Sequence, residues 1–386
     1  MKPARTLIVG GGIGGMAFAA ALQRLGLPFV LLEQAEELGE VGSGLGLLPG
    51  AVRALEALGV GPELYASGAP FRRFRVASRR GEDLAEVSFT RVFEHAGRGG
   101  YVMHRGALHA ALTAQVAGES IRTGARVVGI EQKAGEVEVS LEGDSAPIRG
   151  DLLVGADGLN SVVRRHVLGD GAPRYAGETL FRGIAEARLE EPEISRELFG
   201  DGRRTAYYDL GGDRVYWWAS APLPAESVVP RGERRAYLAR AFEGWAFGVT
   251  ELYARTPEAS ILQNGSFDRR PARTWHRGAA VLLGDAAHPT TPNLGQGACM
   301  ALEDAVVLAR AILGAETPGE AFRSFYAQRR RRTARTVRMS RLWGAVGLWK
   351  RPLLEAMRDA AFRHAPGAWL ERGARDQYCY DPGPLR

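Results

Sequence analysis

A glycine-rich turn near the N-terminus constrains the fold more than any other feature of this 386-residue chain. Thr6–Val9 form an apolar run typical of a buried strand, Gly10–Gly15 follow it, and a helix is expected to about Gly26. A second apolar run then ends at Glu33, with Gln34 beside it, at the distance where an acid accepts hydrogen bonds from a ribose. The pattern therefore predicts a Rossmann-like α/β fold that binds a dinucleotide at the carboxyl end of its first strand.

The glycines of this turn allow the backbone and the nucleotide to approach each other. Gly10 permits the tight turn, Gly12 leaves the backbone open to a pyrophosphate, and Gly15 lets the helix pack closely on the strand. Gly14 precedes Gly15 and is predicted to be a further neighbour of the cofactor. The turn alone does not distinguish FAD from NAD.

A second glycine-bearing loop lies late in the chain. An apolar run, Ala279–Leu283, is typical of a buried strand, and the prolines and glycines that follow it exclude regular structure. A helix is then expected from about Gln296 to Leu313. The N-terminus of such a helix offers unpaired N–H groups to an anionic or electron-rich ligand. Asp285, just ahead of it, can accept from a ribityl or ribose hydroxyl.

Three weaker signals lie between these two loops. Asp151–Gly158 are typical of a buried strand closed by a turn, and taken alone they are best explained as an Asp-Gly turn with a helix cap. Gly44 and Gly46 belong to an alternating glycine stretch that begins at Gly42 and marks either a ligand or a loop shaped by packing alone. Arg105 precedes a predicted helix, where a surface helix cap is the alternative to a ligand contact.

The order of these motifs, GxGxxG then Asp-Gly then Gly-Asp, resembles the single-component group A FAD-dependent aromatic monooxygenases from Leu7 to about Ala309. The resemblance implies that Asp285 binds the ribityl chain of FAD. It also implies that Arg105 reaches the FAD phosphates or ribityl chain, and that the backbone of Val127 lies near the adenine. The cofactor-binding residues that it implies are Gly10, Gly12, Gly14, Gly15, Glu33, Gln34, Gly46, Arg105, Val127, Asp157, Asp285, Gly295, Gln296, Gly297 and Ala298.

The same resemblance implies the chemistry. NADPH or NADH docks transiently and reduces FAD, O2 then forms a flavin hydroperoxide, and its distal oxygen hydroxylates a small aromatic or N-heteroaromatic substrate. The most similar branch contains FAD-dependent urate hydroxylase, hydroxybenzoate hydroxylases and zeaxanthin epoxidase. Its urate enzymes place an Arg and a Tyr where this chain has Arg204 and Tyr216, which are therefore candidate catalytic residues together with Asn293. The urate enzymes carry Asp at the third position, and because Asn cannot act as a base, urate is disfavoured as the substrate.

Two other classes of function remain open from the sequence. One is a flavin-dependent reductase or epoxidase that acts on an isoprenoid or polyene, which a basic, apolar C-terminal helix supports. The other is a non-catalytic flavin-binding redox protein, against which a full glycine loop around the flavin ring argues. His288 is a candidate proton relay, although a hydrogen bond that orders the loop explains this residue equally well.

The chain is expected to contain a discontinuous FAD-binding domain, an inserted mixed β-sheet substrate domain and a C-terminal helical region. The predicted ranges are 1–70, 100–178 and 275–320 for the first, 71–99 and 179–274 for the second, and 321–386 for the third. Strand alternation in an aromatic hairpin places Tyr216 and Trp218 on one face and Val215 and Trp217 on the other. One of these faces is a candidate wall for a flat substrate.

Composition and residue spacing argue against several other functions. The net charge of +6 comes mostly from arginines spread along the chain without a nucleic-acid motif, so no nucleic-acid partner is expected. Cys299 and Cys379 have neither disulfide nor metal spacing, and no metal is expected. Without a signal peptide or an apolar run that could span a bilayer, the chain is predicted to be a cytoplasmic monomer or homodimer without membrane contact.

Overall fold

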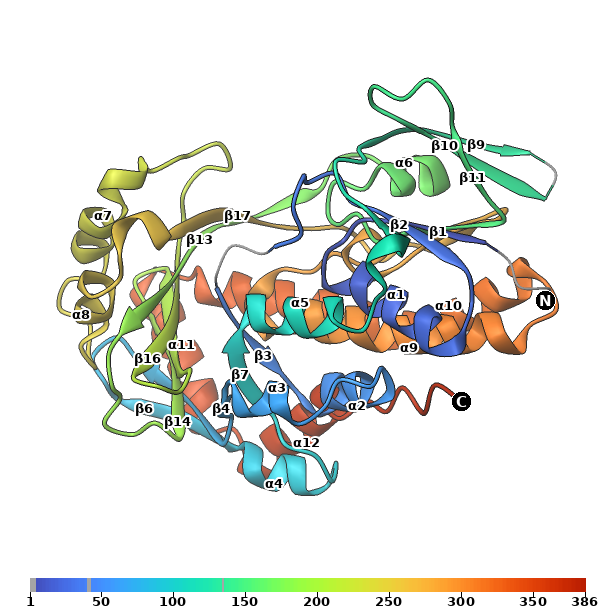
Figure 1. The fold of residues 1–386 in the computed structure, drawn as a ribbon. Helices are drawn as coiled ribbons and strands as arrows, with labels where there is room; N and C mark the ends of the chain where they lie inside the picture. The colour runs from blue at the N-terminus through green and yellow to red at the C-terminus, as the bar shows by residue number, and fades with distance from the viewer. Residues whose placement is uncertain (1–4, 40–42, 134) are drawn as a thin grey trace.

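The computed structural model describes residues 5–39, 43–133 and 135–386, which form a mixed α/β fold (Figure 1). The strands of its first sheet are β1 (Thr6–Val9), β2 (Phe29–Leu32), β8 (Ile121–Arg122), β12 (Leu152–Gly155), β18 (His276–Arg277) and β19 (Ala280–Leu282). They lie in the order β18-β19-β12-β1-β2-β8, and β18 is antiparallel to its neighbour while the other pairs are parallel. The Rossmann-like fold class predicted from the sequence is confirmed.

The second sheet carries the aromatic hairpin. Its strands are β5 (Arg73–Ser78), β6 (Asp83–Ser88), β13 (Arg174–Glu186), β14 (Ile194–Gly200), β15 (Arg203–Asp209), β16 (Arg214–Ala221) and β17 (Leu262–Asp268). They lie in the order β17-β13-β16-β15-β14-β5-β6, antiparallel apart from the parallel pair β14 and β5. In the hairpin, Tyr208 pairs with Tyr216 and Tyr207 with Trp217.

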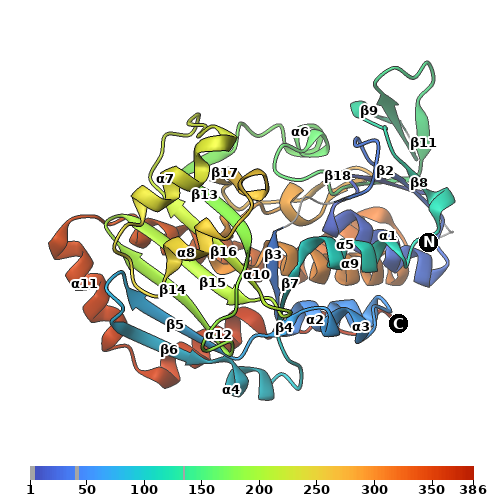
Figure 2. The same cartoon turned by 60° about the vertical axis from the view of Figure 1, so that its left-hand side comes forward.

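Two smaller antiparallel sheets and the helices complete the described part of the chain. β3 (Gly44–Leu47) and β4 (Ala69–Pro70) flank β7 (Tyr101–His104), and Figure 2 shows β3 and β7 between the two large sheets. β9 (Val127–Lys133), β10 (Glu136–Leu141) and β11 (Ile148–Gly150) form a separate sheet. The helices are α1 (Ile13–Leu25), α2 (Pro49–Ala57), α3 (Glu63–Ala66), α4 (Phe89–Glu94), α5 (Arg105–Thr113), α6 (Val162–Leu168), α7 (Arg234–Ala241), α8 (Val249–Ala254), α9 (Gly297–Gly314), α10 (Pro318–Gly347), α11 (Pro352–Arg363) and α12 (Gly367–Tyr378).

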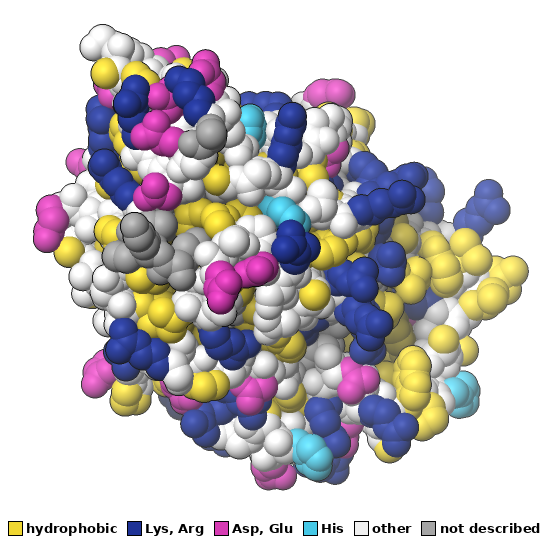
Figure 3. All heavy atoms as spheres, turned by 90° about the vertical axis from the view of Figure 1, so that its right-hand side faces the viewer, with side chains coloured by type: hydrophobic (Ala, Val, Ile, Leu, Met, Phe, Trp, Pro, Cys, Tyr) yellow, Lys and Arg dark blue, Asp and Glu magenta, His cyan; other side chains and the backbone are white. Residues whose placement is uncertain are grey.

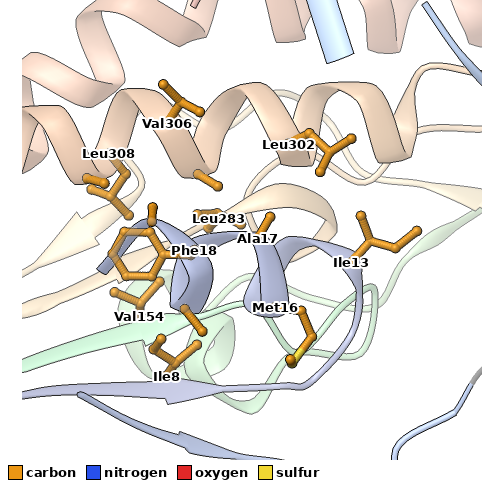
Figure 4. Packing of buried hydrophobic residues seen from close by; sticks show 14 of the residues in the cluster. Ile8, Ile13, Met16, Ala17, Phe18, Val154, Leu283, Leu302, Val306 and Leu308 are labelled. Atoms are coloured by element: carbon orange, nitrogen blue, oxygen red, sulfur yellow. The ribbon is translucent and has the colours of Figure 1, made fainter. Parts of the chain in front are cut away.

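Helix α1 is buried between the first sheet and α9. Figure 4 shows Ile8 and Val154 of the sheet on one side of α1, and Leu302 and Val306 of α9 on the other. The side chains of α1 that face α9 include Ala17 and other small residues, so the two helices approach closely. Each large aliphatic side chain buried here stabilises the fold by about 1.5–3 kcal/mol. This core fixes the N-termini of α1 and α9 relative to the strand ends.

The two faces of the second sheet pack against different parts of the molecule. Val215 and Trp217 lie in an apolar cluster with side chains of α7 and α8. Tyr216 and Trp218 lie in another cluster, with Val102 of β7. The alternation predicted from the sequence is therefore confirmed, and the face with Tyr216 and Trp218 is the one that turns toward the nucleotide-binding part.

Helix α10 opens the C-terminal region. Thr317 and Glu320 form a capping box, with Pro318 in the first turn, so the helix begins three residues before the boundary at 321 that the sequence predicts. Within the described ranges, no helix is long and apolar enough to cross a bilayer. Nor does that part of the chain contain three or more His, Cys, Asp or Glu residues grouped to hold a metal ion. Figure 3 shows Lys and Arg side chains spread over the face it presents, with several close together on its right-hand side.

Candidate active site

The carboxyl ends of parallel strands bring the predicted motifs together at one edge of the first sheet. β1 leads into Gly10, β2 into Glu33, β12 into Asp157 and β19 into Asp285. Ligands bind open α/β sheets at this edge, in the crevice outside the strand ends. The fold therefore assembles one candidate site from segments that are far apart in the sequence.

The glycine turn has the geometry that a close backbone approach requires. Gly10 has a φ of +103°, and a Cβ there would lie 2.6 Å from Ala156 O. A Cβ at Gly15 would lie 1.9 Å from Gly10 O, and one at Gly14 would lie 2.9 Å from a leucine side chain after β19. A Cβ at Gly12 would meet nothing within 4 Å, so the backbone at Gly12 faces open space at the N-terminus of α1.

Glu33 is held against this turn. Its carboxylate accepts from the N–H of Gly11 at 2.5 Å and from the N–H of Ala35 at 2.8 Å. Gln34 is exposed beside it. Val127 is buried at the start of β9, in a different sheet, and its predicted place near an adenine stays a prediction.

Asp157 caps helix α6. Its carboxylate accepts from Ser161 Oγ at 2.5 Å and from the N–H of Val162 at 2.7 Å, as an Asp-Gly turn with a helix cap requires. Arg164 of the same helix donates to the two backbone carbonyls that follow Asp285, at 2.8 and 2.9 Å. The structure thus joins the Asp-Gly and Gly-Asp motifs through Arg164, whereas direct contact of Asp157 with FAD stays a prediction.

Asp285 lies beside the N-terminus of α9, and its side chain is open to solvent. A Cβ at Gly297 would lie 3.7 Å from Asp285 Oδ1. Although solvent reaches the side chain, desolvation by the protein around it raises the pKa of Asp285, and the charges of His288 and Arg105 oppose that rise. Arg105 begins α5 and donates its backbone N–H to Ser43 O at 2.9 Å. Asp285 and Arg105 therefore lie close enough for their charges to interact, although they come from distant segments of the chain.

The glycine stretch and the start of α9 also meet. Cys299 Sγ donates to Gly46 O at 3.3 Å, although 253 residues separate them. Gly295 has a φ of +61°, and a Cβ at Gly46 or Gly295 would meet nothing within 4 Å. Gln296 is buried, and its side-chain Oε1 accepts from Arg332 Nη2 at 3.0 Å. Gly42 lies outside the described residues.

These positions fit FAD. The open backbone at Gly12 and the N–H groups of the α1 N-terminus suit a pyrophosphate. Glu33 at the end of β2 suits a ribose, and Asp285 suits a ribityl chain. The half-buried first turn of α9, with Gly297 and Ala298, offers further N–H groups to the flavin ring.

His288 orders the loop after β19. Its Nε2 lies 2.5 Å from Asp304 Oδ2, which also accepts from the N–H of Gly284 at 3.1 Å. Arg329 donates to the other oxygen of Asp304 at 2.6 Å. Since His288 is only 3% exposed, the geometry favours the loop-ordering hydrogen bond over a proton relay.

Tyr216 packs directly on the glycine stretch. A Cβ at Gly44 would lie 2.2 Å from Tyr216 Cγ, so a side chain at position 44 would displace the ring. Tyr208 stacks on Tyr216 with 5.7 Å between ring centroids, and Trp218 Nε1 donates to the Tyr208 hydroxyl at 3.5 Å. These three residues form an aromatic wall on the sheet face that turns toward β3 and β7.

Arg204 and Asn293 belong to a buried charge cluster. Arg204 is fully buried and donates to Glu178 at 2.7 Å, to Glu197 at 2.9 Å and to Asn293 Oδ1. Asn293 Nδ2 donates to Ser340 O of α10 at 3.0 Å, so both polar atoms of this amide are engaged. Because these hydrogen bonds of Arg204 and Asn293 are all made within the protein, a direct contact of Arg204 with substrate stays a prediction.

Two carboxylates of this cluster share one guanidinium. Burial raises the pKa of Glu197 to about 7, and the charge of Arg204 opposes the rise. Burial also acts to raise the pKa of Glu178, but Arg204 and the Ser220 hydroxyl outweigh it and hold that pKa below its usual value. The two environments therefore separate the pKa values of the carboxyls, and Glu197 is the one that stays protonated to the higher pH.

Arg182 is a candidate residue that the sequence reasoning missed. It pairs with Trp218 from β13, and its Nη2 donates to Asn264 Oδ1 at 2.8 Å. Burial raises the pKa of Tyr216 and lowers that of Arg105, and the charge of Arg182 lowers both. Within the described residues, Arg182 Nε is buried without a hydrogen-bond partner. Because Arg182 pairs with Trp218, its side chain lies on the same face of the sheet as the aromatic wall. Strand alternation in β13 was the only sequence signal that pointed to this residue.

Comparison with known proteins decides the family. A family model described as an FAD-binding domain matches residues 4–195 and 242–340. The chain belongs to the group A FAD-dependent monooxygenases. It is an FAD-dependent monooxygenase of aromatic or heteroaromatic substrates, and NAD(P)H and O2 are the co-substrates typical of these enzymes. This membership does not support the reductase or the non-catalytic alternative.

Two relatives and one solved structure are similar over most of the chain. The aurachin C monooxygenase/isomerase of Stigmatella aurantiaca is 37% identical, over 92% of this chain and 93% of that protein. The 2-heptyl-3-hydroxy-4(1H)-quinolone synthase of Pseudomonas aeruginosa is 33% identical, over 95% of each. The crystal structure of Klebsiella pneumoniae HpxO with FAD and uric acid has a TM-score of 0.90 and 30% identity, and covers 99% of this chain and 98% of that one.

Proposed function

We propose that this enzyme hydroxylates a flat N-heteroaromatic ring of the 4(1H)-quinolone class, as a single polypeptide that takes electrons from NADPH or NADH. The observation that carries the proposal is the position of Arg182, a partly exposed cation on the aromatic wall of Tyr208, Tyr216 and Trp218. The 33% identity to an enzyme whose name specifies a 4(1H)-quinolone product supports this class of substrate.

The aromatic residues of the wall and the two nearby arginines have different roles in this proposal. Tyr216 and Trp218 provide flat apolar surface for a fused ring. Arg182 and Arg105 supply positive charge that stabilises the oxygen of a deprotonated ring, which makes the ring more electron-rich at the carbon to be hydroxylated. When bound, FAD reduced by NAD(P)H supplies the activated oxygen. A largely apolar wall also keeps water from the reacting carbon.

The hydrogen bonds of Asn293 argue for a substrate other than urate. Its amide is engaged on both sides, by Arg204 and by Ser340, so it orients a loop and takes no proton. We assign Arg204 and Asn293 the role of positioning the loop before α9 against β15, and Tyr216 that of contacting the ring. The choice of nicotinamide nucleotide and the monomeric or dimeric state stay predictions.

The test is NAD(P)H oxidation by the purified FAD-loaded protein, with hydrogen peroxide assayed in parallel. The panel holds a 4(1H)-quinolone, urate, a hydroxybenzoate, a hydroxypyridine and a carotenoid. A quinolone that accelerates oxidation without peroxide release, and yields a product heavier by one oxygen atom, is the expected result. The matched variant Arg182→Met should raise the KM for the quinolone or the peroxide yield. Coupled turnover with urate or the carotenoid, and none with the quinolone, would overturn the proposal.

A further inference from the structure

A pocket lies between α2, α10 and α12, and none of the residues proposed above to contact FAD or the substrate lines it. It encloses about 510 Å³. Five arginines line it, together with one carboxylate, that of Asp376. A wall with this charge ratio attracts anions, and the low dielectric of a pocket strengthens that attraction relative to water.

Internal ion pairs match some of these arginines but not all. The matched pairs are Arg53 with Asp381 (3.3 Å), Arg332 with Glu303 (2.7 Å) and Arg335 with Asp376 (3.6 Å). Arg331 and Arg375 have no acidic partner among the residues whose positions the structure describes. Two unmatched guanidinium groups therefore remain on the pocket wall.

Of these two arginines, Arg375 gives the stronger indication that the pocket binds a ligand. Its Nε is buried, and in the described part of the chain no acceptor reaches it. A buried donor of a charged group costs about 1–3 kcal/mol or more when it is left without an acceptor. The charges of Arg53, Arg375 and Arg332 all lower the pKa of Cys379, which burial raises, so these three guanidinium groups surround one point.

Arg332 connects this pocket to the loop before α9. Its Nη2 donates to Gln296 Oε1 at 3.0 Å and to Glu303 Oε1 at 2.7 Å, and its Nη1 donates to Gln377 O at 2.6 Å. Gln296 occupies the N-cap position of α9, next to Gly297 and Ala298, which are proposed to lie near the flavin ring. A charge placed beside Arg332 therefore acts on a guanidinium that is hydrogen-bonded to the residue at the start of α9.

We propose that the pocket between α2, α10 and α12 binds a phosphate-type dianion, and that its occupancy is transmitted through Arg332 to the flavin environment. Arg331 and Arg375 supply the two charges that match a dianion. Guanidinium groups bind phosphate oxygens through paired N–H donors, which a monovalent halide does not use in this way. Free phosphate and the phosphate of a nucleotide are the two sources of this group.

The experiment titrates FAD-loaded protein with inorganic phosphate, pyrophosphate and AMP at constant ionic strength set by chloride. Calorimetry measures binding, and the flavin absorbance and fluorescence report on the loop. The expected result is saturable binding that shifts the flavin spectrum, and AMP separates a nucleotide source from free phosphate. In Arg375→Gln and Arg331→Gln the affinity should fall about tenfold or more, as expected for the loss of one charged donor.

Arg338→Gln is the matched control, because Arg338 is exposed on the same helix but lines a different pocket. This variant should bind phosphate as the unaltered protein does and give the same spectral shift. Equal binding in Arg375→Gln and the unaltered protein, no saturable binding, or an adventitious ion only, displaced equally by chloride, would overturn the site. Binding without any change in the flavin spectrum would overturn the coupling.

Discussion

Asp285 illustrates how a single side chain gains a role from its place at the end of a strand. A strand end on one side and a helix N-terminus on the other leave its carboxylate open to solvent beside Gly297. The N-terminal N–H groups of the helix stabilise a negative charge there. We propose that the same carboxylate accepts hydrogen bonds from the ribityl chain of FAD, and so contributes to cofactor retention.

Asp285→Ala should therefore weaken FAD retention. Loss of hydrogen bonds to a charged group costs about 1.5–3 kcal/mol, which is about a tenfold to hundredfold loss of affinity. The measurement is the ratio of flavin to protein absorbance after gel filtration at low concentration. Asp144→Ala removes an exposed carboxylate and serves as control. Full flavin occupancy in Asp285→Ala would contradict the assignment.

Glu197 gives the buried cluster a pH dependence. Its folded pKa, about 7, lies above the ordinary value of 4.5, so its contribution to stability is complete below about pH 4.5. That contribution is lost as the pH rises through 7. Relative to Glu197→Gln, the free energy of unfolding of the unaltered protein should fall by about 3 kcal/mol between pH 4.5 and pH 8. Denaturant titrations at pH 5, 6 and 7 measure the difference over most of this range.

An exposed residue provides the comparison for this pH series. Glu190→Gln should leave the difference from the unaltered protein constant across the same pH range. If the difference is also constant for Glu197→Gln, Glu197 does not lose a proton over this pH range, which would contradict the prediction.

At the scale of elements, two glycines let α10 approach the second sheet, which carries the aromatic hairpin. A Cβ at Gly344 would lie 2.4 Å from Asn293 Nδ2 and 3.0 Å from Glu178 Oε1. A Cβ at Gly347 would lie 2.2 Å from Arg204 Cδ. The helix therefore closes over the charge cluster because these positions carry no side chain.

Gly344→Ala should destabilise the fold even though alanine favours a helix. Alanine gains about 1 kcal/mol of helix propensity over glycine, whereas overpacking a buried contact costs about 1–3 kcal/mol, and the hydrogen bonds of Asn293 prevent relaxation. Gly373→Ala on α12, where a Cβ meets nothing within 4 Å, should instead be neutral or stabilising. Thermal unfolding of both variants tests the opposite signs.

The sequence predicted the elements that carry local patterns and missed what distant segments add. The turn at Gly10, the strand before Gly284 and helix α9 were predictable because glycines, apolar runs and helical spacing mark them directly. The burial of Arg204 was not, because Glu178, Glu197 and α10 reach it from other elements. Alternation separated the two faces of the hairpin, but the sequence did not show which face forms the aromatic wall, nor that Arg182 of β13 pairs with Trp218 on it.

At the scale of the whole molecule, buried charges join the C-terminal region to the nucleotide-binding part. Arg329 of α10 is fully buried and donates to Asp304 at 2.6 Å and Glu303 at 2.7 Å, both on α9. Asp304 in turn holds His288 and the N–H of Gly284. The helical region that the sequence set apart as residues 321–386 thus supports the loop that carries Asp285.

Arg329→Met should test whether this region unfolds with the rest. Removal of one partner from a buried charge network costs about 3–5 kcal/mol, because Asp304 and Glu303 then lose a shared cation inside the protein. If α10 is part of one cooperative unit, far-UV circular dichroism and flavin release will show a single transition at lower temperature. Arg330→Met removes an exposed arginine from the next position and should change stability by less than about 0.5 kcal/mol. Two separate transitions in Arg329→Met, with flavin retained through the first, would mean that the C-terminal helices fold as an independent unit.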